Sequence, residues 1–268
     1  EAAVMAAGEI GGEQAREALR KAVGHERADV RFQAVAAYAA VAGEDARAAI
    51  SVALGDDDPL VRQSAIESLT TLDPSEDACT RIARLLTDRE EDVADEAAIA
   101  LGQLGDRRGL SRLTKLAVGP RGFEAMAAIG DLGGRFDLKG SDTTNVLDTL
   151  AGALLKPLLV KAAAATALIR LGDPRGDAHF RAVLDAFRND ARTYCVEVIG
   201  ELRLAAYASD VVAMLDRPRG AEPAAIVRAL SRLKDASDVA RSAFDGLLAR
   251  TDVLGALARE IGVSEETR

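Results

Sequence analysis

Few residues in this sequence have the types and spacing that acid–base or nucleophilic chemistry needs. The 268 residues contain two histidines, His25 and His179, which lie far apart along the chain. A Ser-His-Asp arrangement or a histidine-rich metal cluster cannot be built from them. The run Asp56-Asp57-Asp58 lacks the spaced ligands and the glycine of a calcium-binding loop and is better explained as helix capping. We predict no catalytic residue, no metal site and no cofactor.

The two cysteines, Cys79 and Cys195, each lie inside an apolar pattern of helical type. Cys195 occupies a position that other copies of the repeat described below fill with alanine, so we expect a small core residue. Cys79 has no adjacent histidine or basic cluster that would lower the pKa of its thiol. The separation of the two residues argues against a disulfide framework or a structural zinc site and favours a reducing compartment.

The composition favours helices packed on helices. Hydrophobic residues make up 49% of the chain, charged residues 29% and aromatic residues only 3%, and there is no tryptophan. A core of small side chains lets helices approach closely, whereas β-sandwich strands favour β-branched and aromatic residues. Most prolines lie between apolar segments, where they separate helices without interrupting them.

The charge and the hydropathy pattern limit the partners. The formal net charge is −9 and the sequence pI is about 4.9, which disfavours binding to phosphate backbones and to anionic membrane surfaces. No stretch approaches the roughly 18 uninterrupted apolar residues of a membrane span, and the N-terminus lacks a basic region followed by an apolar one. We predict a cytoplasmic protein that binds neither nucleic acid nor membrane.

A repeat of about 31 residues organises the chain. Its clearest copy runs from Val61 to Leu72, with an apolar anchor, a following Arg62, and further apolar residues four, eight and eleven positions after the anchor. These offsets fall on one side of a helix at roughly 100° per residue. The anchors of the copies that we identify in full are Val30, Val61, Val93, Arg121, Val160, Ala191, Glu222 and Val253, and Ala3, Ala7 and Ile10 form the end of an earlier copy.

A second apolar helix separates successive anchored helices, as at residues 78–86. Glycine and aspartate mark the turns: Gly105-Asp106 and Gly172-Asp173 follow a leucine at a predicted helix end. Acidic residues such as those at 56–58 precede the anchored helices, where carboxylates favour the helix N-terminus. The pattern predicts an antiparallel helix pair in each repeat.

The repeat resembles HEAT repeats, especially the short subtype named after phycobilisome lyases. The resemblance lies in an apolar residue followed by arginine, then alanine and a Leu-Gly-x-Leu-Gly-Asp segment, at a period of about 31 residues. The resemblance covers essentially the whole chain. It implies an all-α, right-handed α-α superhelix of about eight helix pairs, with the anchored helices on the concave side. It also implies that the arginine after each anchor pairs with an acidic turn residue of a neighbouring repeat. Arg31, Arg62, Lys161 and Arg192 fill that position, but Ala94, Gly122 and Pro223 interrupt it.

Enzymes with similar repeats supply three comparisons. HEAT-like deoxyhypusine hydroxylases bind a di-iron centre through several His-Glu pairs, whereas this sequence has the single pair His25-Glu26. HEAT-like alkylpurine glycosylases bind DNA through basic, aromatic-bearing surfaces, which this acidic chain lacks. Bilin lyases and isomerases of the same repeat subtype stay open as an alternative.

We interpret residues 1–268 as one continuous solenoid with an inserted loop near 133–143, in the longer interval between Arg121 and Val160. Insertions of this kind often form loops on a binding face, although a neutral insertion is the alternative. Because the sequence begins at Glu1 inside a helical pattern, we expect it to be a fragment of a longer protein. The regulatory arm of a larger enzyme is therefore a further alternative function.

The predicted function is a non-catalytic scaffold or adaptor that binds a basic or amphipathic segment of a partner protein along the concave face. The side chains two and six residues after each anchor point away from the predicted core. An apolar patch with an acidic rim on that surface would concentrate the affinity for a partner segment. An alternative is that Phe32 and Phe123 pack between adjacent helices. The predicted protein-binding residues are Phe32, Glu67, Asp95, Ile99, Phe123, Thr166 and Glu197.

Overall fold

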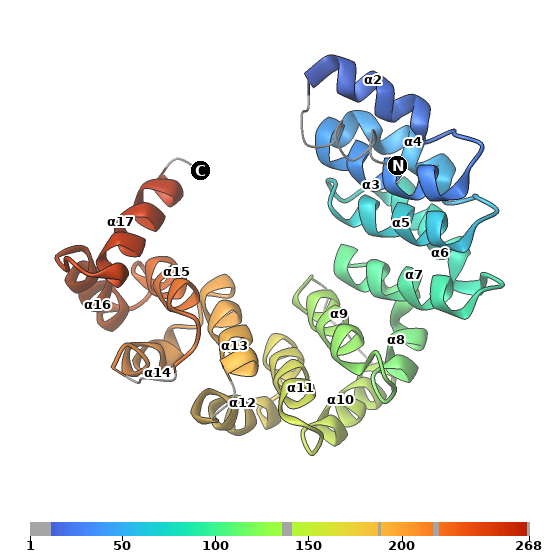
Figure 1. The fold of residues 1–268 in the computed structure, drawn as a ribbon. Helices are drawn as coiled ribbons and strands as arrows, with labels where there is room; N and C mark the ends of the chain where they lie inside the picture. The colour runs from blue at the N-terminus through green and yellow to red at the C-terminus, as the bar shows by residue number, and fades with distance from the viewer. Residues whose placement is uncertain (1–11, 136–140, 187–188, 217–219, 267–268) are drawn as a thin grey trace. The chain divides into compact units, whose positions relative to one another are not determined.

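The fold is helical throughout the part of the chain that the structure describes. A computed structural model describes residues 12–135, 141–186, 189–216 and 220–266, and these form α-helices, short 3-10 helices and turns. The chain divides into two compact units, residues 1–149 and 150–268. Each unit is a stack of helices, and the all-α, HEAT-like fold class predicted from the sequence is confirmed (Figure 1).

The first unit alternates longer helices with shorter ones. Its stacked helices, which carry the repeat anchors, are α3 (Ala28–Ala42), α5 (Pro59–Thr70), α7 (Glu91–Leu104) and α9 (Gly122–Arg135). The partner helices are α2 (Gly12–Ala22), α4 (Arg47–Ala53), α6 (Glu76–Arg84) and α8 (Leu110–Leu116), with 3-10 helices η1 (Gly43–Ala46), η2 (Leu85–Thr87) and η3 (Arg107–Gly109). Helix α10 (Ser141–Ala153) contains the boundary between the two units.

The second unit repeats this arrangement. Its stacked helices are α11 (Leu158–Arg170), α13 (Asn189–Glu201), α15 (Pro223–Leu233) and α17 (Val253–Glu266). Its partner helices are α12 (Arg175–Asp185), α14 (Ala208–Ala213) and α16 (Asp238–Leu248), with the 3-10 helix η4 (Ala205–Tyr207) before α14.

The core lies where consecutive stacked helices meet one another and their partner helices. Helix α3 contacts α5, α5 contacts α7, and α7 contacts α9, while α11, α13, α15 and α17 contact one another in the same order (Figure 1). The predicted core positions are buried: Val61, Ala65 and Leu69 of α5 are fully inaccessible to solvent. Cys195 is fully buried too, as predicted. Val253 is 74% exposed because no described helix follows α17 in the stack.

The turns use the predicted capping chemistry. The carboxylate of Asp58 accepts hydrogen bonds from the backbone N–H groups of Leu60 and Val61, so it caps the N-terminus of α5. Gly105 has φ 81° directly after α7, and Gly172 has φ 72° after α11. Both adopt the left-handed conformation in which a Cβ atom would be strained. Acidic turns and Leu-Gly-Asp sequences therefore mark the ends of the helices as expected.

The structure describes only the two ends of the loop predicted near 133–143. Helix α9 continues through Arg135 and α10 begins at Ser141, so both ends of the predicted loop are helical. Glycine is tolerated in a helix at a cost of about 1 kcal/mol relative to alanine, and neighbouring helical residues can offset that cost. Residues 136–140 and the earlier repeat copy at Ala3, Ala7 and Ile10 lie outside the described residues.

Candidate binding surfaces

The predicted protein-binding residues fall into three groups by exposure. Phe32, on α3, is 41% exposed, and Glu67 on α5 and Glu197 on α13 are also exposed. Asp95 and Phe123 are half-buried. Ile99 and Thr166 are 3% and 2% exposed. Because the last two belong to the core, they cannot form part of a binding surface, and the prediction was wrong for them.

Ile99 and Thr166 are buried because a helix inside a stack has neighbours on several sides. Helix α7 packs against α5 and α9 and also against α6 and α8, so the single apolar stripe assumed from the sequence underestimates its buried surface. A Cβ atom on Gly102 would lie 2.8 Å from Cβ of Ala128, which shows how closely α7 and α9 approach. In α11 every residue from Ala162 to Leu168 is buried.

Asp95 pairs with a partner helix and does not form the rim of an apolar groove. Its Oδ1 atom lies 2.5 Å from Nε of Arg112 on α8, and the same guanidinium contacts Glu91 at 2.7 Å. The offset of two residues from the anchor therefore turns the Asp95 side chain toward α8. The acidic rim predicted from Glu67, Asp95 and Glu197 is wrong at this position.

An acidic cluster crosses the stacked helices of the first unit. It consists of Glu67 on α5, Glu96 on α7, Arg121 directly before α9, and Glu124 on α9, and we call it the Glu67 cluster. Nη2 of Arg121 lies 2.7 Å from Oε2 of Glu96, and Nε of Arg121 lies 2.6 Å from Oε2 of Glu124. Two carboxylates thus share one guanidinium and Glu67 lies outside ion-pair distance of it, so the cluster carries an excess of negative charge.

Glu67 is the carboxylate of this cluster that Arg121 neutralises least. Burial raises the pKa of the Glu67 carboxyl, the neighbouring charge of Glu96 raises it further, and Arg121 offsets part of the rise. Among the described residues, no cation lies within ion-pair distance of Glu67. A cationic group from outside the chain would relieve this repulsion, because an opposite charge favours the ionised carboxylate.

The open face of the second unit is bridged by ion pairs between stacked helices. Glu197 of α13 pairs with Arg228 of α15 at 3.4 Å, and Arg170 of α11 lies 3.7 Å from Glu201 of α13. Both residues of the Glu197 pair have the offset of six residues from their anchors, so that offset faces the same surface on neighbouring helices. The exposed Glu197–Arg228 pair should contribute up to about 1 kcal/mol.

The arginine that follows the anchor serves the structure, as the resemblance implied. Arg31 pairs with Asp56 at 2.7 Å, and Arg62 pairs with Asp88 at 2.7 Å, one repeat further along. Arg62 also donates to the backbone carbonyl oxygens of Asp56 and Asp57. These interactions tie each stacked helix to the turn before the next one. Ala94 ends this series of pairs at α7.

Sequence reasoning missed a group of cations around η3 and α8. Arg107, Arg108, Arg112 and Lys115 lie within nine residues of a chain whose net charge is −9. Three hollows surround this segment, with volumes of about 340, 390 and 520 Å³, and Arg108 lines all three. The cluster of basic residues is visible in the sequence, but only the packing of the helices shows that this segment borders cavities.

The described residues contain no group of three or more His, Cys, Asp or Glu side chains that could hold a metal ion. Nδ1 of His25 accepts a hydrogen bond from the backbone N–H of Arg27, and the Glu26 carbonyl oxygen accepts one from Arg31. This pair therefore shapes the turn before α3. In the described part of the chain, no helix combines the length and the apolar character that a membrane span needs.

Comparison with known proteins identifies the family. The sequence pattern of HEAT repeats matches residues 1–70 and 46–133. The chain is a HEAT-repeat protein. No curated protein matches it in sequence.

Among solved structures, a similar chain comes from the complex of CpcE and CpcF of phycocyanin lyase from Nostoc sp. PCC7120. The TM-score is 0.67 at 20% identity, with 94% of this chain and 96% of that chain covered. Human deoxyhypusine hydroxylase in complex with glycerol matches with a TM-score of 0.38 at 20% identity, with 94% and 95% covered. An engineered protein matches with a TM-score of 0.47 at 17% identity, with 96% and 82% covered.

Proposed function

We propose that this chain is a non-catalytic scaffold that binds a basic segment of a partner protein across the stacked helices of its first unit. The Glu67 cluster is the observation that supports this function. The cluster has three carboxylates and one guanidinium, which pairs with Glu96 and Glu124, so a lysine or arginine of a partner would complete the charge balance at Glu67. Charge complementarity of this kind accelerates association and selects partners more than it adds affinity.

The exposed Phe32 extends this surface toward α3. Its backbone carbonyl oxygen accepts a hydrogen bond from the Ser64 hydroxyl of α5, so the two helices are adjacent at this point. An exposed aromatic ring on the helix next to α5 would provide an anchor for an amphipathic segment. The proposed surface therefore comprises Phe32 and the Glu67 cluster, without the buried Ile99 and Thr166.

Two further observations support protein binding over catalysis. HEAT-repeat surfaces commonly bind other macromolecules through their stacked helices, and the similar CpcE–CpcF structure is a complex of two proteins. A lyase- or isomerase-like enzyme and the regulatory arm of a larger enzyme are the alternative functions. A fast-reacting thiol in the folded protein would favour the enzyme, and retention of a catalytic protein in the binding experiment would favour the regulatory arm.

The test is a pull-down from the source cell lysate with three forms of the chain. The cluster variant carries Glu67→Lys and Glu124→Lys, and a charge-matched control carries Glu26→Lys and Asp45→Lys, which are exposed outside the cluster. We expect a protein that the parent and the control retain and the folded cluster variant loses, with weaker retention at higher salt. Equal retention by both variants, or no specific protein with the parent, would overturn the proposed surface.

A further inference from the structure

The 340 Å³ cavity between α8 and α10 differs from its two neighbours in the charge of its walls. It is lined by Arg107, Arg108, Leu110, Ser111, Thr114, Lys115, Asn145 and Val146. No carboxylate is among these residues. The 390 Å³ hollow includes Glu76 and Asp106, and the 520 Å³ hollow includes Glu91 and Asp95, so acidic groups already balance the arginines there.

Two of the cations that line this cavity have no acidic partner among the residues that the structure describes. Arg108 is held by Asp106 and Glu76. Arg107 and Lys115 are exposed, and neither forms an ion pair with a described residue. A local positive charge of this kind is unusual in a chain with net charge −9, and it favours anions over cations at this position.

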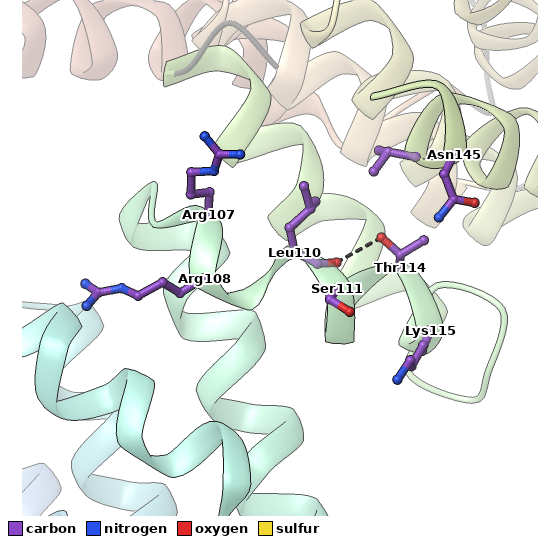
Figure 2. A pocket seen from close by; sticks show the side chains of 8 residues that line it. Arg107, Arg108, Leu110, Ser111, Thr114, Lys115 and Asn145 are labelled. Atoms are coloured by element: carbon purple, nitrogen blue, oxygen red, sulfur yellow. Dashed lines mark hydrogen bonds between the residues drawn. The ribbon is translucent and has the colours of Figure 1, made fainter. Parts of the chain in front are cut away.

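The two cations lie at opposite ends of the cavity wall. Figure 2 shows Arg107 before Leu110 and Lys115 beyond Thr114, so the apolar and hydroxyl side chains lie between the two charges. They are eight positions apart, and the rise of the 3-10 helix η3 (about 2 Å per residue) followed by that of α8 (about 1.5 Å per residue) places their backbones roughly 13 Å apart along the wall. Both side chains are long, so their charged ends can approach the two ends of an elongated ligand that carries an anionic group at each end.

The middle of the cavity combines apolar and hydrogen-bonding groups. Leu110 and Val146 are 8% and 2% exposed and form an apolar wall. Ser111 and Asn145 are exposed at its edge and are available to orient a polar group. The Thr114 hydroxyl donates to the carbonyl oxygen of Leu110 at 2.8 Å, so it faces a ligand as an acceptor (Figure 2).

We infer that this cavity binds a small organic dianion with an apolar middle, such as a linear dicarboxylate. The volume lies within the range of about 300–1,000 Å³ that is typical of small-molecule sites, and few polar groups around an apolar body are their usual composition. Arg107 and Lys115 bind the two anionic ends, and Leu110 and Val146 contact the chain between them. This site is independent of the proposed protein-binding surface on the stacked helices.

Isothermal titration calorimetry and thermal melting at low salt test this inference. The probes are adipate and suberate as dicarboxylates, hexanoate as a monocarboxylate, inorganic phosphate, and 1,6-diaminohexane as a cation. A ligand that binds the folded state raises the melting temperature in a concentration-dependent way. We expect a dicarboxylate to bind at least tenfold more tightly than hexanoate and phosphate, and the diamine not to bind.

Three variants locate the site. Arg107→Gln with Lys115→Gln should weaken dicarboxylate binding at least tenfold, whereas the charge-matched control Arg84→Gln with Lys156→Gln, at exposed positions elsewhere, should leave it unchanged. Ser111→Trp keeps both cations and fills the cavity, so it should abolish binding. The inference would be overturned if none of the anions bound, or if the two double variants lost binding equally. Undiminished binding by Ser111→Trp would also overturn it, because the anion would then lie on the outer surface.

Discussion

The guanidinium of Arg62 lies 2.7 Å from the carboxylate of Asp88, and the two side chains are 5% and 8% exposed. Arg62 is the residue after the anchor of α5, and Asp88 lies in the turn before α7. The pair therefore joins two consecutive repeats through a contact that water scarcely reaches. Such a pair is held by its hydrogen bonds as much as by its charges, because desolvation opposes the Coulombic attraction.

Replacing Arg62 by alanine should destabilise the protein by about 3–5 kcal/mol, because it leaves the Asp88 carboxylate buried without its partner. The double variant Arg62→Met with Asp88→Leu should lose less than Arg62→Ala. Urea unfolding followed by circular dichroism measures both. Arg241→Ala is the control, since Arg241 and Asp238 form an exposed pair that should contribute about 1 kcal/mol or less. A loss for Arg62→Ala no larger than that for Arg241→Ala would contradict the prediction.

Acid should weaken the same series of pairs. The hydrogen bonds from Arg31 hold the pKa of the Asp56 carboxyl below its usual value, although burial opposes them. A lowered folded-state pKa contributes stability above the unfolded-state pKa near 3.8, and that stability is lost as the pH falls through the folded-state value.

Asp56→Asn removes this titration. The variant should be less stable than the parent at pH 7, and the difference between the two should shrink below about pH 4. Unfolding in urea at pH 7, 5, 4 and 3 measures the difference. A difference that stays constant over this range would show that Asp56 does not contribute through its charge.

Gly102 should not accept a larger side chain. A Cβ atom there would lie 2.8 Å from Cβ of Ala128 and 2.9 Å from Cδ1 of Leu113, so Gly102→Ala should cost about 1–3 kcal/mol through overpacking. Gly246, within α16, has no atom near the position of a Cβ. Gly246→Ala should therefore stabilise the protein by up to about 1 kcal/mol through helix propensity. Thermal melts of the two variants should shift in opposite directions, and a shared direction would refute the close approach of α7 and α9.

Ile99 and Phe32 should respond differently to truncation. Ile99→Ala removes a buried side chain and should cost about 2–5 kcal/mol. Phe32→Ser changes a side chain that is 41% exposed and should cost less, about 1–2 kcal/mol. Denaturant unfolding separates the two effects. A large loss for Phe32→Ser would place its ring in the core and remove it from the proposed binding surface.

Neither thiol should react rapidly in the folded protein. Burial raises the pKa of the Cys195 thiol far above its ordinary value. Burial also raises the pKa of the Cys79 thiol, and the carboxylates of Asp106 and Glu76 raise it further. Since the thiolate is the reactive form, a disulfide reagent at pH 7.5 should modify both residues quickly only after unfolding. One fast-reacting thiol in the folded state would favour the enzyme alternative.

The sequence by itself determined the repeat and the ends of its helices. The anchor positions in α5 and the capping by Asp58 depend on periodicity and on interactions within a few residues, which a sequence displays directly. The pairing of Arg31 and Arg62 with turn aspartates was an expectation from the resemblance to HEAT repeats, and the structure contains both pairs. Local rules therefore sufficed for the fold class.

Only the tertiary structure decided which surfaces remain open. Ile99 and Thr166 have offsets that face solvent on an isolated amphipathic helix, yet they are buried because stacked neighbours cover several sides of α7 and α11. The Glu67 cluster and the cavity beside α8 likewise join side chains from different helices. How closely two helices approach depends on the small residues of both, such as Gly102 and Ala128, and this mutual fit has no signature in either segment alone.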